Sequence, residues 1–204
     1  MSDLDGLAGL LDGTSLEVAP RLLGAVLRHG EVAVRLTEVE AYAGPDDPGS
    51  HAYRGRTRRN AVMFGPSGHL YCYFTYGMHV CANVVVGEEG DPGAVLVRAG
   101  EVVDGLPTAR SRRPGATDRD LARGPARLCR ALGIGLEHDG TDLAGGEVRL
   151  QPGERVATVS TGPRVGLRGA PDRTWRFWAT GDPTVSAYRP AVPRRGRDPG
   201  AGQA

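Results

Sequence analysis

Lysine is absent from this chain of 204 residues, in which all 25 lysine-or-arginine positions are arginine. Without a lysine amine, no side chain can form the Schiff base that covalent catalysis at a carbonyl or sugar carbon uses. The same absence excludes a Walker-type phosphate loop, which needs a lysine. Arginine is no substitute as a nucleophile, because its guanidinium stays protonated. The remaining amine is the α-amino group of Met1, at the head of an acidic segment.

Cysteine is scarce, and no paired metal-binding motif is present. The three cysteines are Cys72, Cys81 and Cys129. An odd number without framework spacing predicts free thiols. The cysteines and histidines form neither CxxC pairs nor an HExxH motif, so no metal site is expected. A metal-dependent hydrolase that uses His51, His69 and Glu40 remains an alternative.

Long apolar runs are also missing, which excludes a membrane-spanning helix of about 18 residues or more. The acidic start lacks the basic residues of a secretory signal, so the cytoplasm is the expected compartment. A hydrophobic content of 40% suits a globular protein, and 204 residues suit one domain.

Net charge is only +1, which by itself is weak evidence for a nucleic-acid partner. The average hides a local concentration of positive charge. Four arginines lie within six positions, at Arg54, Arg56, Arg58 and Arg59. Such a cluster is usually a solvated surface, and a nucleic-acid contact is the alternative.

Apolar periodicity and turn residues predict a mixed α/β domain over 15–190. The expected helices lie at 15–23, capped by Ser15, and at 125–132. The expected strands lie at 25–28, 31–42, 69–75, 78–86 and 94–98, with further short strands over 147–188. Residues 43–68 and 103–120 are expected to be loops, and 1–14 and 191–204 to be flexible tails.

Glu40 is the first candidate for chemistry. Counting in steps of two places it on one strand face with Val32, Val34, Leu36 and Glu38, provided that no bulge intervenes. A carboxylate on an apolar face is costly unless it is paired or used. The pattern therefore leaves two interpretations: a structural salt bridge to an arginine, or a functional carboxylate.

The hairpin formed by 69–75 and 78–86 is the second candidate. Gly77 suits its turn, whereas Tyr76 beside it is an unusual turn residue. An exposed tyrosine at this tip would suit a wedge between DNA base steps, and the alternative is that it folds back onto the domain. Tyr71 and Tyr73 share one strand face, as ordinary cross-strand packing or as a binding platform.

Several separated motifs, in one order along the chain, resemble the alkyladenine (3-methyladenine) DNA glycosylase family. TEVEAYAGPDD at 37–47, followed by His51, is similar to the family's catalytic strand and loop. RN at 59–60, MF at 63–64, LYCYFTYGM at 70–78 and then Asn83 are similar to its intercalating hairpin. LVRA at 96–99, GPARLC at 124–129 and RVG at 164–166 continue the series. The likeness covers roughly residues 16–190.

The resemblance implies a role for each matching position in the base pocket. Glu40 matches the general base that activates water. Arg98 matches an arginine near the base-bearing nucleotide. The side chains that sandwich and contact the flipped base match Tyr42, His51 and Tyr73.

Further roles concern specificity and DNA. Asn83 matches the residue that meets the purine's minor-groove edge and disfavours guanine, and Tyr76 matches the wedge that fills the gap in the duplex. Neighbouring positions expected to contact DNA are Gly77, Met78, His79 and Arg59. His79 stands where vertebrate members of the family carry another aromatic residue, so the resemblance does not define the minor-groove contacts at this position, although it still implies the reaction.

For the whole protein, the resemblance implies a single mixed α/β (α+β) domain around a curved antiparallel sheet with a protruding hairpin. It implies a repair enzyme that acts on damaged double-stranded DNA without metal or cofactor. Because the chain has no lysine, we expect the enzyme to be monofunctional, and we expect a monomer that acts on the nucleoid without a membrane partner. A binding module that uses the Arg54–Arg59 cluster and Tyr76 without chemistry is the alternative from another class.

Overall fold

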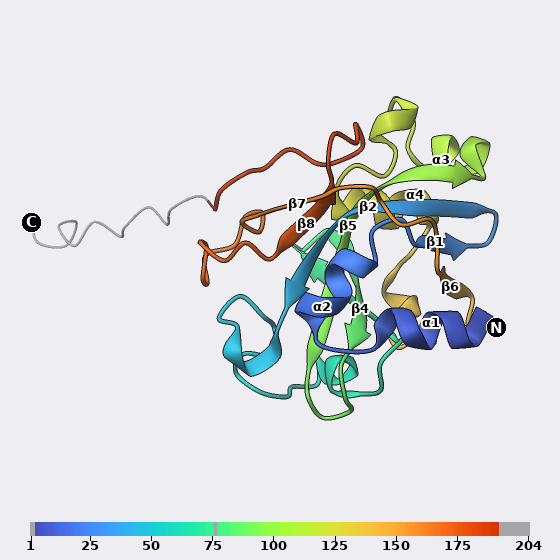
Figure 1. Cartoon of the computed structure of the whole chain (residues 1–204). Coiled ribbons are helices and arrows are strands. Elements are labelled where there is room, and N and C mark those ends of the chain that lie inside the picture. Colours follow the sequence, from blue (N-terminus) through green and yellow to red (C-terminus); the bar gives the residue numbers. More distant parts are fainter. Residues whose placement is uncertain (1–2, 76, 192–204) are drawn as a thin grey trace, which may run out of the picture.

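Eight antiparallel strands form one curled sheet in the computed structural model, which describes residues 3–75 and 77–191 (Figure 1). The strand order is β3-β4-β5-β2-β1-β6, with β8 also pairing with β2 and β7 with β8. The strands are β1 (Val26–His29), β2 (Val32–Tyr42), β3 (Leu70–Thr75), β4 (His79–Val86), β5 (Gly93–Asp104), β6 (Val148–Gln151), β7 (Val159–Gly162) and β8 (Arg176–Ala179). The single domain and its curved antiparallel sheet confirm the predicted fold class.

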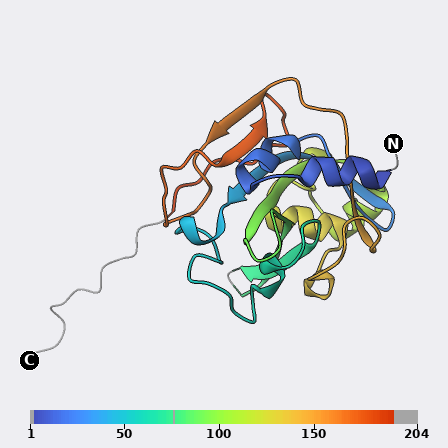
Figure 2. The same cartoon turned by 60° about the horizontal axis from the view of Figure 1, so that its bottom comes forward.

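Helices cover the sheet and complete the core. They are α1 (Asp3–Leu11), α2 (Ser15–Arg21), α3 (Leu106–Arg112) and α4 (Pro125–Leu132), with four short 3-10 helices, η1 (Gly44–Asp46), η2 (Ala61–Phe64), η3 (Asp118–Asp120) and η4 (Leu136–His138). Figure 2 shows α1 and α2, in blue, following one another across the sheet. No helix among the described residues is both long and apolar enough to cross a membrane.

The N-terminal segment differs from its prediction. Residues 3–11 form α1, whereas the sequence pattern predicted a loose tail, because Leu7 and Leu11 stand one turn apart and both join the core. The cap of α2 is Thr14 rather than Ser15, and it forms a capping box with Glu17.

Two other elements differ from the sequence prediction. The stretch 103–120, predicted as a loop, contains α3, which follows Gly105 in a left-handed conformation (φ +68°) and buries Ala109. β5 extends to Asp104, beyond the predicted 94–98, because its outer half pairs with the first half of β2. In this half Gly100 and the exposed Glu101 interrupt the apolar run, so the pattern predicted only the first part of the strand. The helix Pro125–Leu132 and the hairpin β3–β4 were predicted correctly.

A bulge in the middle of β2 decides which side chains face the site. The pairing of β2 with β5 shifts between Leu36 and Glu38 and again between Glu38 and Val39. The residues of β2 in the main core are Val32, Val34 and Leu36 before the bulge, and Val39 and Ala41 after it. The alternation therefore slips by one residue. The prediction that Glu40 shares a face with Val32, Val34 and Leu36 was wrong, since Glu40 faces the opposite side.

Candidate active site

One row of side chains crosses four strands on the face opposite the main core. Strand register aligns Tyr71 with Asn83, Asn83 with Leu96, and Leu96 with Glu40. The neighbouring rows add Tyr73 beside Cys81, and Ala94 beside Tyr42. All of these side chains line a cavity of about 820 Å³. The sheet thus brings residues from β2, β3, β4 and β5 to one place.

Six predicted site residues line this cavity: Glu40, Tyr42, His51, Tyr73, Asn83 and Arg98. The segments 165–168 and 189–191 close it from the other side. A larger hollow of about 970 Å³ lies beside α1 and α2, but it contains none of the predicted site residues. Its charged lining is entirely acidic, which is unfavourable for a DNA backbone. The cavity over the sheet is therefore the candidate site.

Glu40 is fully buried within the domain, yet its carboxylate reaches the cavity. Oε1 accepts a hydrogen bond from the Val165 backbone N–H at 2.7 Å. Oε2 accepts a hydrogen bond from the Tyr42 hydroxyl at 2.9 Å. Arg98 Nη1 lies 3.3 Å from Oε1. These three donors hold the carboxylate in one orientation.

Behind Glu40, a second buried carboxylate holds Arg98 in place. Arg98 Nε donates to Glu38 Oε1 at 2.8 Å, and Arg176 Nε donates to the same atom at 2.7 Å. The Ser186 N–H and hydroxyl also donate to this carboxylate, at 2.7 and 2.9 Å. Burial opposes ionisation, but Arg98 and Arg176, together with Ser186, keep the pKa of Glu38 below its ordinary value. Arg98 therefore bridges two carboxylates from adjacent positions of the same face.

An aromatic wall stands on the β3 side of the cavity. His51 Nδ1 lies 3.0 Å from the Tyr71 hydroxyl, and its ring meets Tyr73 edge-on at 4.5 Å between centroids. Burial, with a smaller contribution from Arg59, lowers the pKa of His51, which favours a neutral imidazole. Burial also raises the pKa of Tyr71 to about 12, so its hydroxyl stays protonated.

Asn83 is fixed on the floor of the cavity. Its side chain is buried and donates from Nδ2 to the Tyr71 carbonyl at 3.1 Å. This bond leaves the Asn83 amide in one rotamer, as a specificity residue against a base edge requires.

The hairpin tip projects from the domain beside this wall. Phe74 and Met78 are 50% and 72% exposed, and His79 and Gly77 are also exposed. Arg59 donates to the Phe74 carbonyl at 3.2 Å, although it does not line the cavity. The prediction for Tyr76 falls outside the described residues. Large apolar groups left in solvent indicate a contact surface.

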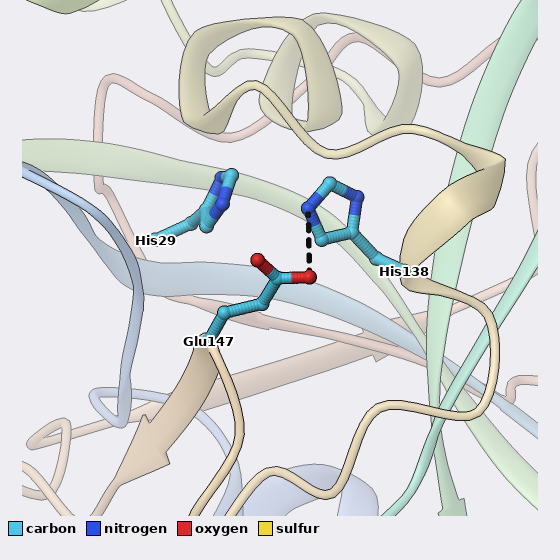
Figure 3. Close-up of side chains that lie close together, drawn as sticks. All are labelled: His29, His138 and Glu147. Carbon is cyan, nitrogen blue, oxygen red and sulfur yellow. Dashed lines mark ion pairs between the residues drawn. The ribbon is translucent and has the colours of Figure 1, made fainter.

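One group in the described residues has metal-ligand composition, and it lies away from the cavity. His29, His138 and Glu147 bring three ligand atoms within 4.8 Å of one another (Figure 3). His29 Nδ1 donates to the Leu132 carbonyl at 2.9 Å, which leaves Nε2 free as a ligand. His138 Nδ1 instead accepts from the Gly135 N–H at 3.0 Å, so a neutral ring carries its proton on Nε2, the atom that faces Glu147. This hydrogen bond opposes metal ligation by His138.

The cysteines and histidines that the sequence offered as metal ligands do not lie together in the structure. Cys72 packs into the main core, whereas Cys81 lies on the cavity face, and both are free thiols, as is Cys129. Within the described residues, His51 and His69 form no ligand cluster with Glu40.

Comparison with known proteins shows that this chain belongs to a class of DNA glycosylases. Residues 10–183 match the sequence model of the methylpurine-DNA glycosylase (MPG) family. A protein of Nocardia farcinica is 56% identical over 193 residues, covering 90% of this chain and 89% of the relative. One of Streptomyces avermitilis is 54% identical over 193 residues (89% and 91%), and one of Frankia casuarinae 49% identical over 214 residues (97% and 100%). All three carry the name "Putative 3-methyladenine DNA glycosylase". The chain belongs to the methylpurine-DNA glycosylase family, as its motifs implied.

Proposed function

We propose that this protein excises alkylated or deaminated purines from double-stranded DNA, with Glu40 as the general base for a water molecule. The observation that carries the proposal is the setting of Glu40. It is a buried carboxylate oriented by three donors at the floor of an aromatic cavity. The family and the names of the relatives support the substrate class.

Access to Glu40 requires the target nucleotide to leave the helix. The carboxylate lies inside a cavity of about 820 Å³, and a base stacked in a duplex cannot reach it. Enzymes of this kind rotate the nucleotide out of the stack, at a cost of a few kcal/mol that is smaller for a damaged pair. We propose that the exposed hairpin tip with Met78 and His79 enters the duplex, with Tyr76 as the wedge and Gly77 and Arg59 as further DNA contacts.

The reaction needs one base and no protein nucleophile. The water oxygen bonds to the sugar C1′, its proton passes to Glu40, and the C1′–N bond breaks with its electron pair leaving on the purine. A positively charged base such as 3-methyladenine is a good leaving group, so one carboxylate suffices. O-glycosidases, whose leaving groups are poorer, usually need a second, acidic carboxyl. The negative charge of Glu40 also stabilises the oxocarbenium-like sugar.

Recognition of the base rests on the walls of the cavity. Tyr42, Tyr73 and His51 present ring faces or edges to a flipped purine, and a cationic base gains roughly 0.5–2 kcal/mol from such faces. Asn83 is proposed to meet the minor-groove edge, where guanine alone carries a 2-amino group. We further propose that the protein is a monomer that acts in the cytoplasm on the nucleoid. The predicted domain, 15–190, would then extend toward the N-terminus to include α1, since Leu7 and Leu11 join the core.

The test is an excision assay on duplexes that contain hypoxanthine and on methylated DNA. We expect free base, an intact abasic strand that breaks only after alkali, and no adduct trapped by borohydride, because the chain has no lysine. Lesion binding without base release would favour the binding-module alternative. Strand breaks without alkali, or a trapped adduct, would contradict a monofunctional enzyme.

A further inference from the structure

Arg164 has an environment that the proposed reaction does not explain. It is 2% exposed, and it donates to the Ala41 carbonyl at 2.9 Å and from Nη2 to Asp47 Oδ1 at 2.7 Å. Asp47 is fully buried and accepts a second bond, from Nη1 of the same guanidinium. Within the described residues, Arg164 Nε has no hydrogen-bond partner. A buried ion pair of this kind is usually no more stable than well-packed apolar residues, so its presence calls for another reason.

The pair joins the two loops that surround Glu40. Asp47 lies in the loop that follows β2, where it also accepts the Gly49 N–H at 3.0 Å. Arg164 lies beyond β7, and the next residue is Val165, whose N–H donates to Glu40 at 2.7 Å. Fixing the Arg164 backbone therefore fixes the amide that orients Glu40.

The Arg164 guanidinium also positions the second donor to Glu40, which is the Tyr42 hydroxyl. Its central carbon lies 4.6 Å from the centre of the Tyr42 ring and 5.0 Å from that of Trp175, so the guanidinium contacts two aromatic rings. Tyr42 lines the cavity and Arg164 does not, so the guanidinium supports the ring from the side away from the substrate. The Tyr42 hydroxyl is the donor to the other oxygen of Glu40. Both neutral donors to Glu40 thus depend on one arginine.

We propose that Arg164, neutralised by Asp47, is a positioning residue that sets the Val165 amide and the Tyr42 hydroxyl against Glu40. The inference rests on the proposed role of Glu40 as the base. Lysine cannot replace Arg164, because an ammonium neither forms the two parallel bonds to a carboxylate nor offers a planar face to an aromatic ring. Loss of position affects the rate of bond cleavage more than the binding of DNA.

Asp47 has a separate consequence for substrate choice. A cationic base on the cavity side of Tyr42 would face the Arg164 charge across the ring, and the Asp47 carboxylate cancels that charge. Removing the carboxylate should therefore penalise cationic lesions relative to neutral ones, by roughly tenfold for unit charges about 8 Å apart in a partly screened interior. A loss of general stability would lower both rates together.

The experiment compares Arg164→Lys and Asp47→Asn with the wild type and with Arg173→Lys. Arg173 is the matched control, because it also stacks on Trp175, at 4.4 Å, and lies 3.9 Å from Asp47, but it is 36% exposed. Single-turnover excision is measured on hypoxanthine and on 7-methylguanine, a neutral and a cationic lesion. Binding is measured on a duplex that contains a tetrahydrofuran abasic analogue, and folding by circular dichroism and thermal melting.

For Arg164→Lys we expect a loss of about ten- to a hundredfold in excision rate, with binding within threefold of wild type. For Asp47→Asn the ratio of neutral to cationic excision should rise by about tenfold. Arg173→Lys should change neither. If a single variant does not fold, it is replaced by the double variant Asp47→Asn/Arg164→Gln, which removes both charges of the buried pair. We expect this double variant to excise both lesions slowly.

The proposal is overturned if the folded Arg164 variants excise within threefold of wild type. It is also overturned if their rates recover fully on cooling to a temperature at which the variant is as folded as wild type. Inactivity of the wild type itself would instead disprove the proposed function. If Asp47→Asn lowers the excision rates of the cationic and the neutral lesion in equal proportion, the charge argument is disproved. The positioning role is then decided by Arg164→Lys alone.

Discussion

The two faces of the curled sheet use the same strands for opposite purposes. The core face carries small and branched apolar groups such as Val39, Val84 and Val97, all buried and in contact with one cluster. The cavity face carries Glu40 and Arg98 at neighbouring positions of those strands. After the bulge, Glu40 on the cavity face is as fully buried as Val39 and Ala41 on the core face, so exposure does not separate these residues. The difference is that polar groups on the cavity face are held by specific donors, whereas the core face needs only volume.

Among the substitutions on the cavity face, we expect Glu40→Gln to cause the largest loss of excision activity. The amide keeps the size of the side chain but cannot accept the proton of the attacking water. General base catalysis contributes about 10²–10⁴-fold, so we expect a loss of at least a hundredfold in single-turnover excision. Binding to an abasic-analogue duplex should stay within about threefold. Excision within threefold of wild type would show that Glu40 is not the base.

Val39→Ala tests the adjacent residue on the other face. Val39 is fully buried in the main core, and removal of two methyl groups should lower the free energy of unfolding by about 2 kcal/mol. For a chain of this size the melting temperature should fall by roughly 4–8 °C. The excision rate of the folded variant, measured well below that temperature, should match wild type. A rate loss as large as that of Glu40→Gln would show that the two faces are not independent.

The core face could be predicted from the sequence, and the site only in part. Branched residues at alternate positions identify strands such as β4, and Pro125 with Gly133 marks both ends of α4. These signals are local, because propensity and period act within a few residues. The bulge near Glu38 is set by pairing with β5, more than fifty residues away, so counting along β2 gave the wrong face for Glu40.

Long-range partners explain the other gaps. Motif likeness pointed to Glu40, Tyr42 and Arg98, and the structure brings them together. It gave no role to Arg164, although RVG at 164–166 was part of the likeness, because its partner Asp47 is 117 positions away. Glu38 was noted for its place on the strand alone. Its four donors come from three separate segments, and local patterns carry no signal for such a network.

Asn83→Ser would sharpen the comparison by changing specificity while leaving the core face intact. The shorter side chain leaves room for the 2-amino group that guanine presents in the minor groove. We expect the release of 7-methylguanine relative to 3-methyladenine from methylated DNA to rise by roughly tenfold, within the range of a single contact. Excision of hypoxanthine, which has no 2-amino group, serves as the internal control. An unchanged ratio of the two methylated purines would remove Asn83 from the account of specificity.

The smallest expected effect concerns pH and the neutral His51. Burial lowers the pKa of His51 in the folded state below its ordinary value of 6.5, with a further contribution from Arg59. Below pH 6.5 the unfolded chain binds more protons at this residue than the folded chain does, so folding loses stability as the pH falls. Well above pH 6.5 both states are neutral at this position and the contribution vanishes.

Replacing His51 with Gln should therefore reduce the fall in melting temperature between pH 6.5 and 5. The fall caused by carboxylates is shared by both proteins and cancels in the difference. His79→Gln, at the exposed hairpin tip, controls for the loss of an imidazole as such. We expect the wild-type and His51→Gln melting curves to converge in their pH slope above pH 6.5 and to separate below it. Identical slopes at every pH, or a steeper slope for His51→Gln, would mean that the folded protein accommodates a protonated His51, and the cavity face would then tolerate an unpaired charge beside the base.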